Sequence, residues 1–305
     1  MKRTGARLRD TRTAIFFLLP NFLGFLCFTA WPVMASLLLS FTEWDLLTEP
    51  RWVGLDNFVQ LLGWRRDPTG GWAANDPQFW KYFGNTLFLM LPLPVNMLGS
   101  LFLATVLNKK LRFAYGYRLI FFLPHIVSGV AIYYLWRWMY NPDFGLVNAL
   151  LRQFGLAGPR WLTDMHWAKP ALMIMGTWLA VGGSSMILYL AALQGVPPEL
   201  YEAASIDGAT AWQQFRHVTW PAVMPVTFFI LTMGIIHGLQ SGFDMAFVMT
   251  GGGPYGATTT LGYYIYTKAY VFFEMGYAST IAWVLFLVIL TVTIFNWRRG
   301  GKVIA

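Results

Sequence analysis

The sequence contains little charge and almost no cysteine, and both shortages exclude classes of protein. Charged residues make up 12% of the 305 positions, whereas soluble domains carry about a quarter. With 56% hydrophobic residues, this composition indicates an integral membrane protein. The single cysteine, Cys27, lies inside an apolar run, so we expect neither a disulfide framework nor a cysteine metal site.

Residue patterns for enzyme chemistry are also missing. The four histidines, His125, His166, His217 and His237, are scattered and have no metal-ligand spacing. The glycine-rich run Gly251–Pro254 is not followed by the lysine and hydroxyl residue of a phosphate-binding loop. We therefore expect no enzyme activity, no metal and no cofactor in this chain.

Long apolar runs are what the sequence has instead. A helix needs about 20 apolar residues to cross the hydrocarbon of a bilayer. The segments of this length are Ile15–Phe41, Phe83–Leu107, Tyr117–Tyr140, Ala171–Leu193, Val223–Met249 and Tyr277–Trp297. We expect an all-α integral membrane protein of six transmembrane helices. We expect a single transmembrane domain over residues 1–305, with its core over residues 83–297.

The first run follows a basic stretch, as the core of a signal peptide does. Ile15–Phe41 is too long for a signal core and has no convincing cleavage site. We expect residues 1–14 to be a cytoplasmic segment that precedes an uncleaved first span.

The net charge of +8 is distributed as in a membrane protein, not as in a nucleic-acid-binding protein. Basic residues gather before the first span, after the second and after the last, at Lys2, Arg3, Arg7, Arg9, Arg12, Lys109, Lys110, Arg112, Arg118, Arg298, Arg299 and Lys302. Because cytoplasmic segments are rich in Lys and Arg, we expect both termini in the cytoplasm. The segment 42–82 is then external, and the loop between the fourth and fifth spans is cytoplasmic.

That loop, residues 196–221, is a polar island with the sequence VPPELYEAASIDGATAWQQFRHVTWP. Pro197 and Pro198 are suited to the first positions of a helix, and Glu199 falls where the helix dipole favours an acid. Gly208 is a natural helix stop. We expect a short helix, a glycine break, a second amphipathic piece, and Pro221 as the boundary of the next span.

The stretch EAASIDGA, with its flanking Pro, Leu, Tyr, Gln and Phe, resembles the Glu-Ala-Ala loop of permease subunits in binding-protein-dependent ABC importers. The spacing resembles the carbohydrate-uptake branch, of the maltose and glycerol-phosphate type. One departure is Trp220, where the family usually has leucine. The resemblance implies a type I importer permease fold in which this loop docks into a cytoplasmic ATPase. The docking residues that it implies are Glu199, Tyr201, Glu202, Ala203, Ala204, Asp207 and Gly208.

The resemblance also implies the partners and the setting of the chain. These are a second permease subunit, an ATPase dimer that binds ATP and Mg, an extracellular or periplasmic binding protein, and a carbohydrate substrate. The membrane would be the plasma (inner) membrane of a bacterium or archaeon.

Two external segments also resemble those of the permease family. Segment 42–82 contains WVGLDNFVQLL and DPQFWKYFGNTL, separated by GWRRDPTGGWAAN. We expect this insertion, around residues 63–75, to form an ordered turn. It either contacts a binding protein or is a passive loop. After the fifth span, TGGGPYGATTT favours the carbohydrate branch.

Polar residues inside spans tend to face an interior cavity. In the fifth span His237, Ser241 and Asp244 have helical spacing, so we expect them on one face. They either contact substrate or form helix-packing hydrogen bonds. The remaining substrate-pathway candidates are His125, Gly182 and Ser184. His125 alternatively bonds a carbonyl freed by Pro124, and the small residues alternatively serve close helix packing.

Three other functions remain open from the sequence. An amino-acid or peptide permease is the nearest alternative, because the Glu-Ala-Ala loop does not exclude it. A stand-alone secondary transporter would require more ionisable residues within the membrane, and a membrane-embedded enzyme would require His or acidic residues clustered at one depth.

Overall fold

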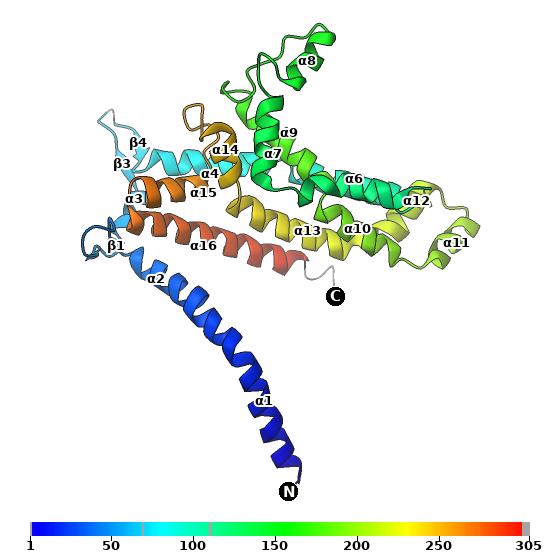
Figure 1. Cartoon of the computed structure of the whole chain (residues 1–305), viewed down its shortest axis with the longest axis horizontal. Coiled ribbons are helices and arrows are strands. Elements are labelled where there is room, and N and C mark those ends of the chain that lie inside the picture. The colour runs from blue at the N-terminus through cyan, green and yellow to red at the C-terminus, as the bar shows by residue number, and fades with distance from the viewer. Residues whose placement is uncertain (1, 69, 110–111, 301–305) are drawn as a thin grey trace. The chain divides into compact units, whose positions relative to one another are not determined.

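The structure is a computed structural model that describes residues 2–68, 70–109 and 112–300. The chain divides into two compact units. The first contains the described residues up to Asp76 together with Ile265–Val284, and the second contains Pro77–Tyr264 and continues from Leu285. Figure 1 shows their helices.

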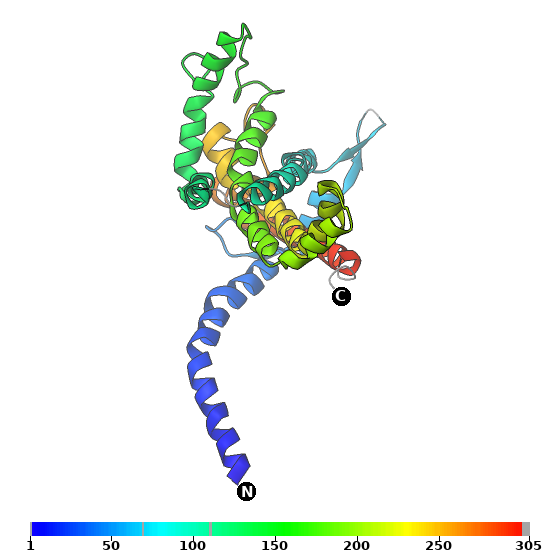
Figure 2. The same cartoon turned by 90° about the vertical axis from the view of Figure 1, so that its right-hand side faces the viewer.

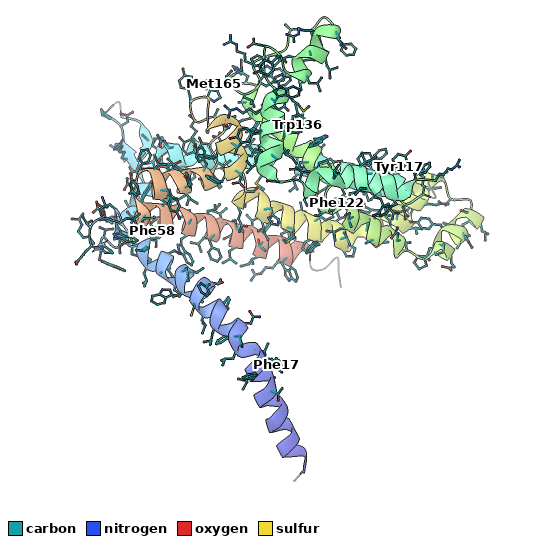
Figure 3. The ribbon with its side chains drawn as sticks, viewed as in Figure 1. Phe17, Phe58, Tyr117, Phe122, Trp136 and Met165 are labelled. Carbon is teal, nitrogen blue, oxygen red and sulfur yellow. The ribbon has the colours of Figure 1, made fainter. Side chains whose placement is uncertain are left out.

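The first unit begins with a long apolar helix. It comprises α1 (Lys2–Phe25), a π-helical turn (Leu26–Ala30) and α2 (Trp31–Leu39). None of the apolar window within Thr13–Leu39 is buried in the protein. The side chain of Phe17, labelled in Figure 3, is 74% exposed. Such a helix requires lipid or another protein around it, as expected for the first span.

The described residues of segment 42–76 form four short strands and a helix. Its elements are β1 (Thr42–Glu43), β2 (Arg51–Trp52), α3 (Asp56–Leu62), β3 (Trp64–Arg66) and β4 (Trp72–Ala74). Strands β1 and β2 pair antiparallel, as do β3 and β4. The described part of the insertion around residues 63–75 is therefore the β3–β4 hairpin, and the expectation of an ordered turn is confirmed.

Buried side chains attach this segment to the start of α16 (Met275–Gly300). The Asn57 amide donates to the carbonyls of Ser40 and Thr42 at 3.0 and 2.9 Å. The Thr280 hydroxyl donates to the same Ser40 carbonyl at 2.9 Å. These bonds join the end of the first span to the last helix within the first unit.

The second unit is helical. Its helices are α4 (Pro77–Leu89), α5 (Leu93–Leu107), α6 (Ala114–Ile126), α7 (Gly129–Met139), α8 (Leu146–Gln153), α9 (Ala168–Val181), α10 (Ser184–Gln194), α11 (Pro198–Ile206), α12 (Ala211–Gln214), a π turn (Phe215–Thr219), α13 (Trp220–Gln240) and α14 (Phe243–Thr250). Next come α15 (Leu261–Tyr266) and a third π turn (Thr267–Val271), which lead into the first unit.

The described residues contain five helical segments long and apolar enough to cross a membrane, or six if α6 and α7 are one broken span. The expected six spans are therefore found, but the third is not continuous. Helices α6 and α7 meet at 94°, and Figure 2 shows α7 standing across the end of α6. Apolar composition predicted Tyr117–Tyr140 as one helix and carried no information about this bend.

The fifth span also differs from the prediction Val223–Met249. Helix α13 ends at Gln240, Ser241 is extended, and Gly242 has a φ of 98° before α14 begins. The other end differs too, because Ala211–Gln240 forms one helical segment. Pro221 lies at the first positions of α13 after a π turn, where its missing N–H is tolerated, so it does not separate the loop from the span.

Two apolar clusters hold the second unit together. The first joins α5, α10 and α13 and consists of Leu101, Ala104, Leu107, Met186, Tyr189, Leu190, Leu193, Val223 and Ile230. The second joins α7, α9 and α14 and includes Ile132, Trp136, Tyr140, Trp161, Ala171, Leu172, Met175 and Met249. Both clusters therefore include helices next to a break in a span.

A buried amide fixes the glycine-rich loop after α14. Asn85 on α4 is 3% exposed and donates to the carbonyls of Gly256 and Thr259 at 2.9 Å each. The neighbouring Thr86 hydroxyl accepts the N–H of Leu261 at 3.0 Å. Side chains of α4 thus form hydrogen bonds with backbone groups of a loop that is neither helix nor strand.

We expect Asn85→Ala to lower the free energy of unfolding by roughly 1–3 kcal/mol, because two buried carbonyls lose their donor. Thermal unfolding of the detergent-solubilised chain measures this. Asn75→Ala is the control: its amide bonds the Val59 carbonyl at an exposed position, and we expect a change within about 0.5 kcal/mol. Equal effects of the two substitutions would contradict this role of Asn85.

Candidate functional site

The Glu-Ala-Ala loop, residues 196–221, forms the helix that the sequence predicts. Pro197 is the extended N-cap of α11 and Pro198 is its first residue, with Glu199 in the first turn. The Ser205 hydroxyl donates to the Tyr201 carbonyl at 2.8 Å. The start of the helix at the two prolines is confirmed.

A Schellman motif ends α11. Gly208 has a φ of 77°, which glycine adopts at low cost. The N–H of Ala209 reaches the Ala204 carbonyl at 2.9 Å, and that of Gly208 reaches the Ser205 carbonyl at 3.1 Å. These are the two bonds of the motif, so the predicted glycine stop is confirmed.

The second piece of the loop begins with a capping box. The Gln213 side chain accepts the Thr210 N–H at 2.7 Å, and the Thr210 hydroxyl accepts the Gln213 N–H at 3.4 Å. Gln214 then donates to the Ser205 hydroxyl at 2.9 Å. The two helical pieces are therefore bonded to each other, and the loop has a definite shape.

The loop is joined to the following span. The Tyr201 hydroxyl lies 3.0 Å from the Thr219 hydroxyl, which belongs to the π turn before α13. The second piece of the loop is continuous with the fifth span, because Ala211–Gln240 is one helical segment. Helix α11 is thus connected to the span both along the chain and through this hydrogen bond.

The outer face of the loop is open. Glu199, Glu202, Ala203, Asp207 and Gly208 are exposed, whereas Tyr201 and Ala204 are half-buried. Ile206 is 87% exposed, and Leu200 and Trp212 are also exposed. A cavity of about 290 Å³ lies between the two pieces, lined by Asp207, Gly208 and Gln213 among others. Exposed apolar and acidic groups on a rigid loop form a surface suited to docking.

Two of the expected pathway residues meet. The His125 ring nitrogen Nε2 lies 2.9 Å from the Ser184 hydroxyl, at the end of α6 and the start of α10. A side chain at Gly182 would collide with the Phe121 carbonyl, and one at Gly183 would lie 3.0 Å from the His125 ring. The small residues therefore serve close packing here.

The expected stripe of the fifth span is wrong, because the helix ends before Ser241. His237 and Ser241 line a cavity of about 280 Å³, and Asp244 is not among its lining residues. Asp244 instead lies exposed in the first turn of α14, where the helix dipole favours an acid. The helical period that grouped the three residues does not continue through Gly242.

Three polar residues of this cavity were not predicted: Thr86, Asn96 and Thr260. The Asn96 side-chain oxygen is buried and has no hydrogen-bond partner among the residues that the structure describes. The signal was present in the sequence, because Asn96 is a polar residue inside the second apolar run. The cavity therefore combines an unpaired acceptor, an imidazole and hydroxyl groups.

Two acids outside the spans, Asp45 and Asp164, have lowered pKa values. Hydrogen bonds from the Thr48 hydroxyl and N–H lower the pKa of Asp45. The N–H of His166, at 2.7 Å, lowers the pKa of Asp164. Both carboxylates are bonded within their own turns. Among the described residues, no three His, Cys, Asp or Glu side chains gather around a possible metal position.

Membrane helices broken around a polar cavity, with an ordered polar loop between two spans, define a multi-pass membrane protein with the permease fold of type I ABC importers. A family model matches residues 96–299. The chain belongs to the family described as the binding-protein-dependent transport system inner membrane component.

Relatives and solved structures agree with this assignment. The chain is 35% identical over 306 residues to the probable ABC transporter permease protein YesP of Bacillus subtilis, covering 99% of this chain and 94% of that protein. It is 35% identical to the lactose transport system permease protein LacF of Rhizobium radiobacter, covering 90% and 89%. Its structure is similar to a bacterial ABC transporter involved in the import of the acidic polysaccharide alginate, with a TM-score of 0.84, 27% identity, and coverage of 98% and 99%.

We expect Gly182→Ala to lower the free energy of unfolding by about 1–3 kcal/mol, because the added methyl group meets the Phe121 backbone. Gly176→Ala is the matched control, since its Cβ would meet nothing within 4 Å; helix propensity predicts a gain of roughly 0.5–1 kcal/mol there. Thermal unfolding in detergent measures both. A Gly182→Ala protein as stable as the wild type would contradict the packing role.

Proposed function

We propose that the chain is one of two permease subunits through which an extracellular binding protein delivers a carbohydrate across the plasma membrane. A cytoplasmic ATPase dimer, which binds ATP and Mg, would supply the energy. The observation that carries this proposal is the Glu-Ala-Ala loop: an ordered, exposed helix bonded to the span that follows it.

The loop would act as the contact with the ATPase. Glu199, Glu202 and Asp207 present carboxylates, and the other docking residues, Tyr201, Ala203, Ala204 and Gly208, shape the helix around them. Closure of the ATPase would displace α11, and α12 with its continuous helix would carry that displacement into the membrane. Rigid-body movement of helices of this kind switches a cavity between two sides.

The substrate class rests on relatives and on the chemistry of the pathway. Lactose and alginate, named for LacF and for the similar structure, are both carbohydrates. A carbohydrate requires many hydrogen-bond partners, and the broken spans bring His237, Ser241 and Asn96 to one cavity. We propose these residues, with His125 and Ser184 at the second break, as pathway residues. A loaded binding protein would have to favour the outward-open state, because a ligand shifts only an equilibrium that it binds differentially.

The distribution of basic residues supports an orientation with both termini in the cytoplasm. Segments that precede the first span and follow the last are basic, and so is the segment after the second span. The Glu-Ala-Ala loop then lies on the side where ATP is available.

We expect Glu202→Lys and Gly208→Asp each to abolish transport while the subunit still inserts. The first reverses a charge on the docking face, and the second forces a side chain into a left-handed position. Uptake by the complete importer measures the effect, with membrane fractionation as the check on insertion. Glu49→Lys, the same charge reversal on an exposed external residue, should leave uptake unchanged. Normal uptake by either loop variant would contradict the coupling role.

We expect a cysteine at Asp207 to react with a membrane-impermeant maleimide only after the cells are permeabilised. A Cys27→Ser background removes the exposed native cysteine. Glu49→Cys in the same background should react in intact cells, because segment 42–82 is proposed to be external. Reaction of the cysteine at position 207 in intact cells would place the loop outside and overturn the proposal.

A further inference from the structure

A second cavity in the permease lies where α7 and α14 end. Its volume is about 450 Å³, within the range of small-molecule sites. Residues from α7, from the segment around Arg160, and from the end of α14 line it. Two arginines, Arg137 and Arg160, are among them, and no acidic residue is. This cavity is named the basic pocket.

The two guanidinium groups have little internal compensation. Arg137 donates to the Val248 carbonyl at 3.3 Å, a neutral acceptor. Among the described residues, the ion pairs within 4 Å involve neither arginine. Asp164, close in sequence to Arg160, has its carboxylate bonded to the N–H groups of His166 and Trp167 at 2.7 and 3.3 Å. The charged side chains that line the pocket are therefore both cationic.

Both arginines are exposed, and they flank two buried aromatic residues that also line the basic pocket. Trp161 is buried beside Arg160, and its indole donates to the Asn148 side chain at 2.6 Å. Tyr140, one turn after Arg137, is buried and donates to the Ala171 carbonyl at 2.9 Å. The two rings lie 5.3 Å apart. The aromatic part of the pocket is therefore formed before any ligand arrives, which reduces the entropy cost of binding, and the two cations lie at its exposed edge.

We propose that the basic pocket binds an acidic saccharide, with sugar carboxylates paired to Arg137 and Arg160 at the outer end of the permease. An arginine binds a carboxylate with two parallel N–H bonds. A neutral sugar has no negative charge to pair with Arg137 or Arg160, so the two cations favour an acidic sugar. The pocket also supplies the Thr163 and Thr250 hydroxyls for sugar hydroxyl groups. This inference rests on the proposed carbohydrate transport and narrows its substrate class to uronate-containing saccharides.

The test uses the complete importer in cells that lack other uptake systems. The probes are trisaccharides of galacturonate, mannuronate and glucuronate, their methyl esters, and neutral trisaccharides of the same length. We expect uptake of at least one acid, in preference to its own ester. Uptake of neutral saccharides alone would overturn the inference and leave carbohydrate transport standing. No uptake of any saccharide would overturn both.

Substitutions locate the preference in the basic pocket. We expect Arg137→Gln and Arg160→Gln each to reduce uptake of the acid by about fivefold, the size of a partly exposed charge interaction, with uptake of its ester unchanged. Arg137→Lys and Arg160→Lys should retain part of the preference, because lysine keeps the charge but not the paired N–H bonds. Arg152→Gln is the control, since this exposed arginine donates to the Asp143 carbonyl and does not line the pocket. Arg137 also donates to α14, so its substitution removes a structural hydrogen bond as well as a charge. If the Arg137→Gln protein fails to accumulate in the membrane for this reason, Arg160→Gln decides the test. An unchanged acid preference in Arg160→Gln would overturn the inference.

Discussion

The structure depends on the requirement that backbone polar groups within a membrane find partners inside the protein. A helix satisfies this requirement alone, so each break in a helix needs a side chain from elsewhere. The Ser100 hydroxyl on α5 donates to the Val181 carbonyl, where α9 stops. The Asn85 amide does the same for the loop after α14. The breaks are thus positioned by a few polar residues, although the bulk of each span is apolar.

Polar side chains gather at the same breaks. The cavity with His237 and Ser241 opens where α13 ends, and the His125–Ser184 contact lies where α6 and α10 meet. At the other end of the fifth span, the Glu-Ala-Ala loop has a Schellman motif and a capping box, and its second piece continues into the span through a π turn without leaving the helix. The chain therefore combines a stiff connection at one end of this span with an interrupted path at the other.

Much of this organisation could be predicted from the sequence. Apolar length found all the spans, and Pro198 and Gly208 marked the ends of α11, because local chemistry decides those positions. The 94° turn between α6 and α7 and the end of α13 at Gln240 could not be predicted in this way. Hydropathy measures preference for the membrane interior and says nothing of helix direction, and Gly242 acts through its left-handed conformation, which composition does not encode. Asn96 was visible as a polar residue inside an apolar run, but the cavity that it lines depends on tertiary packing that the sequence pattern does not describe.

The helical segment Ala211–Gln240 has 30 residues, and at 1.5 Å per residue it is about 45 Å long. A hydrocarbon core is about 30 Å thick, so roughly three turns extend beyond it. Trp212 and the capping box lie at the start of this segment. If the loop is the proposed contact with the ATPase, this length gives it leverage: a sideways push of a few ångströms at Ala211 would tilt the segment, and its other end at Gln240 would move beside the break at Ser241 and Gly242.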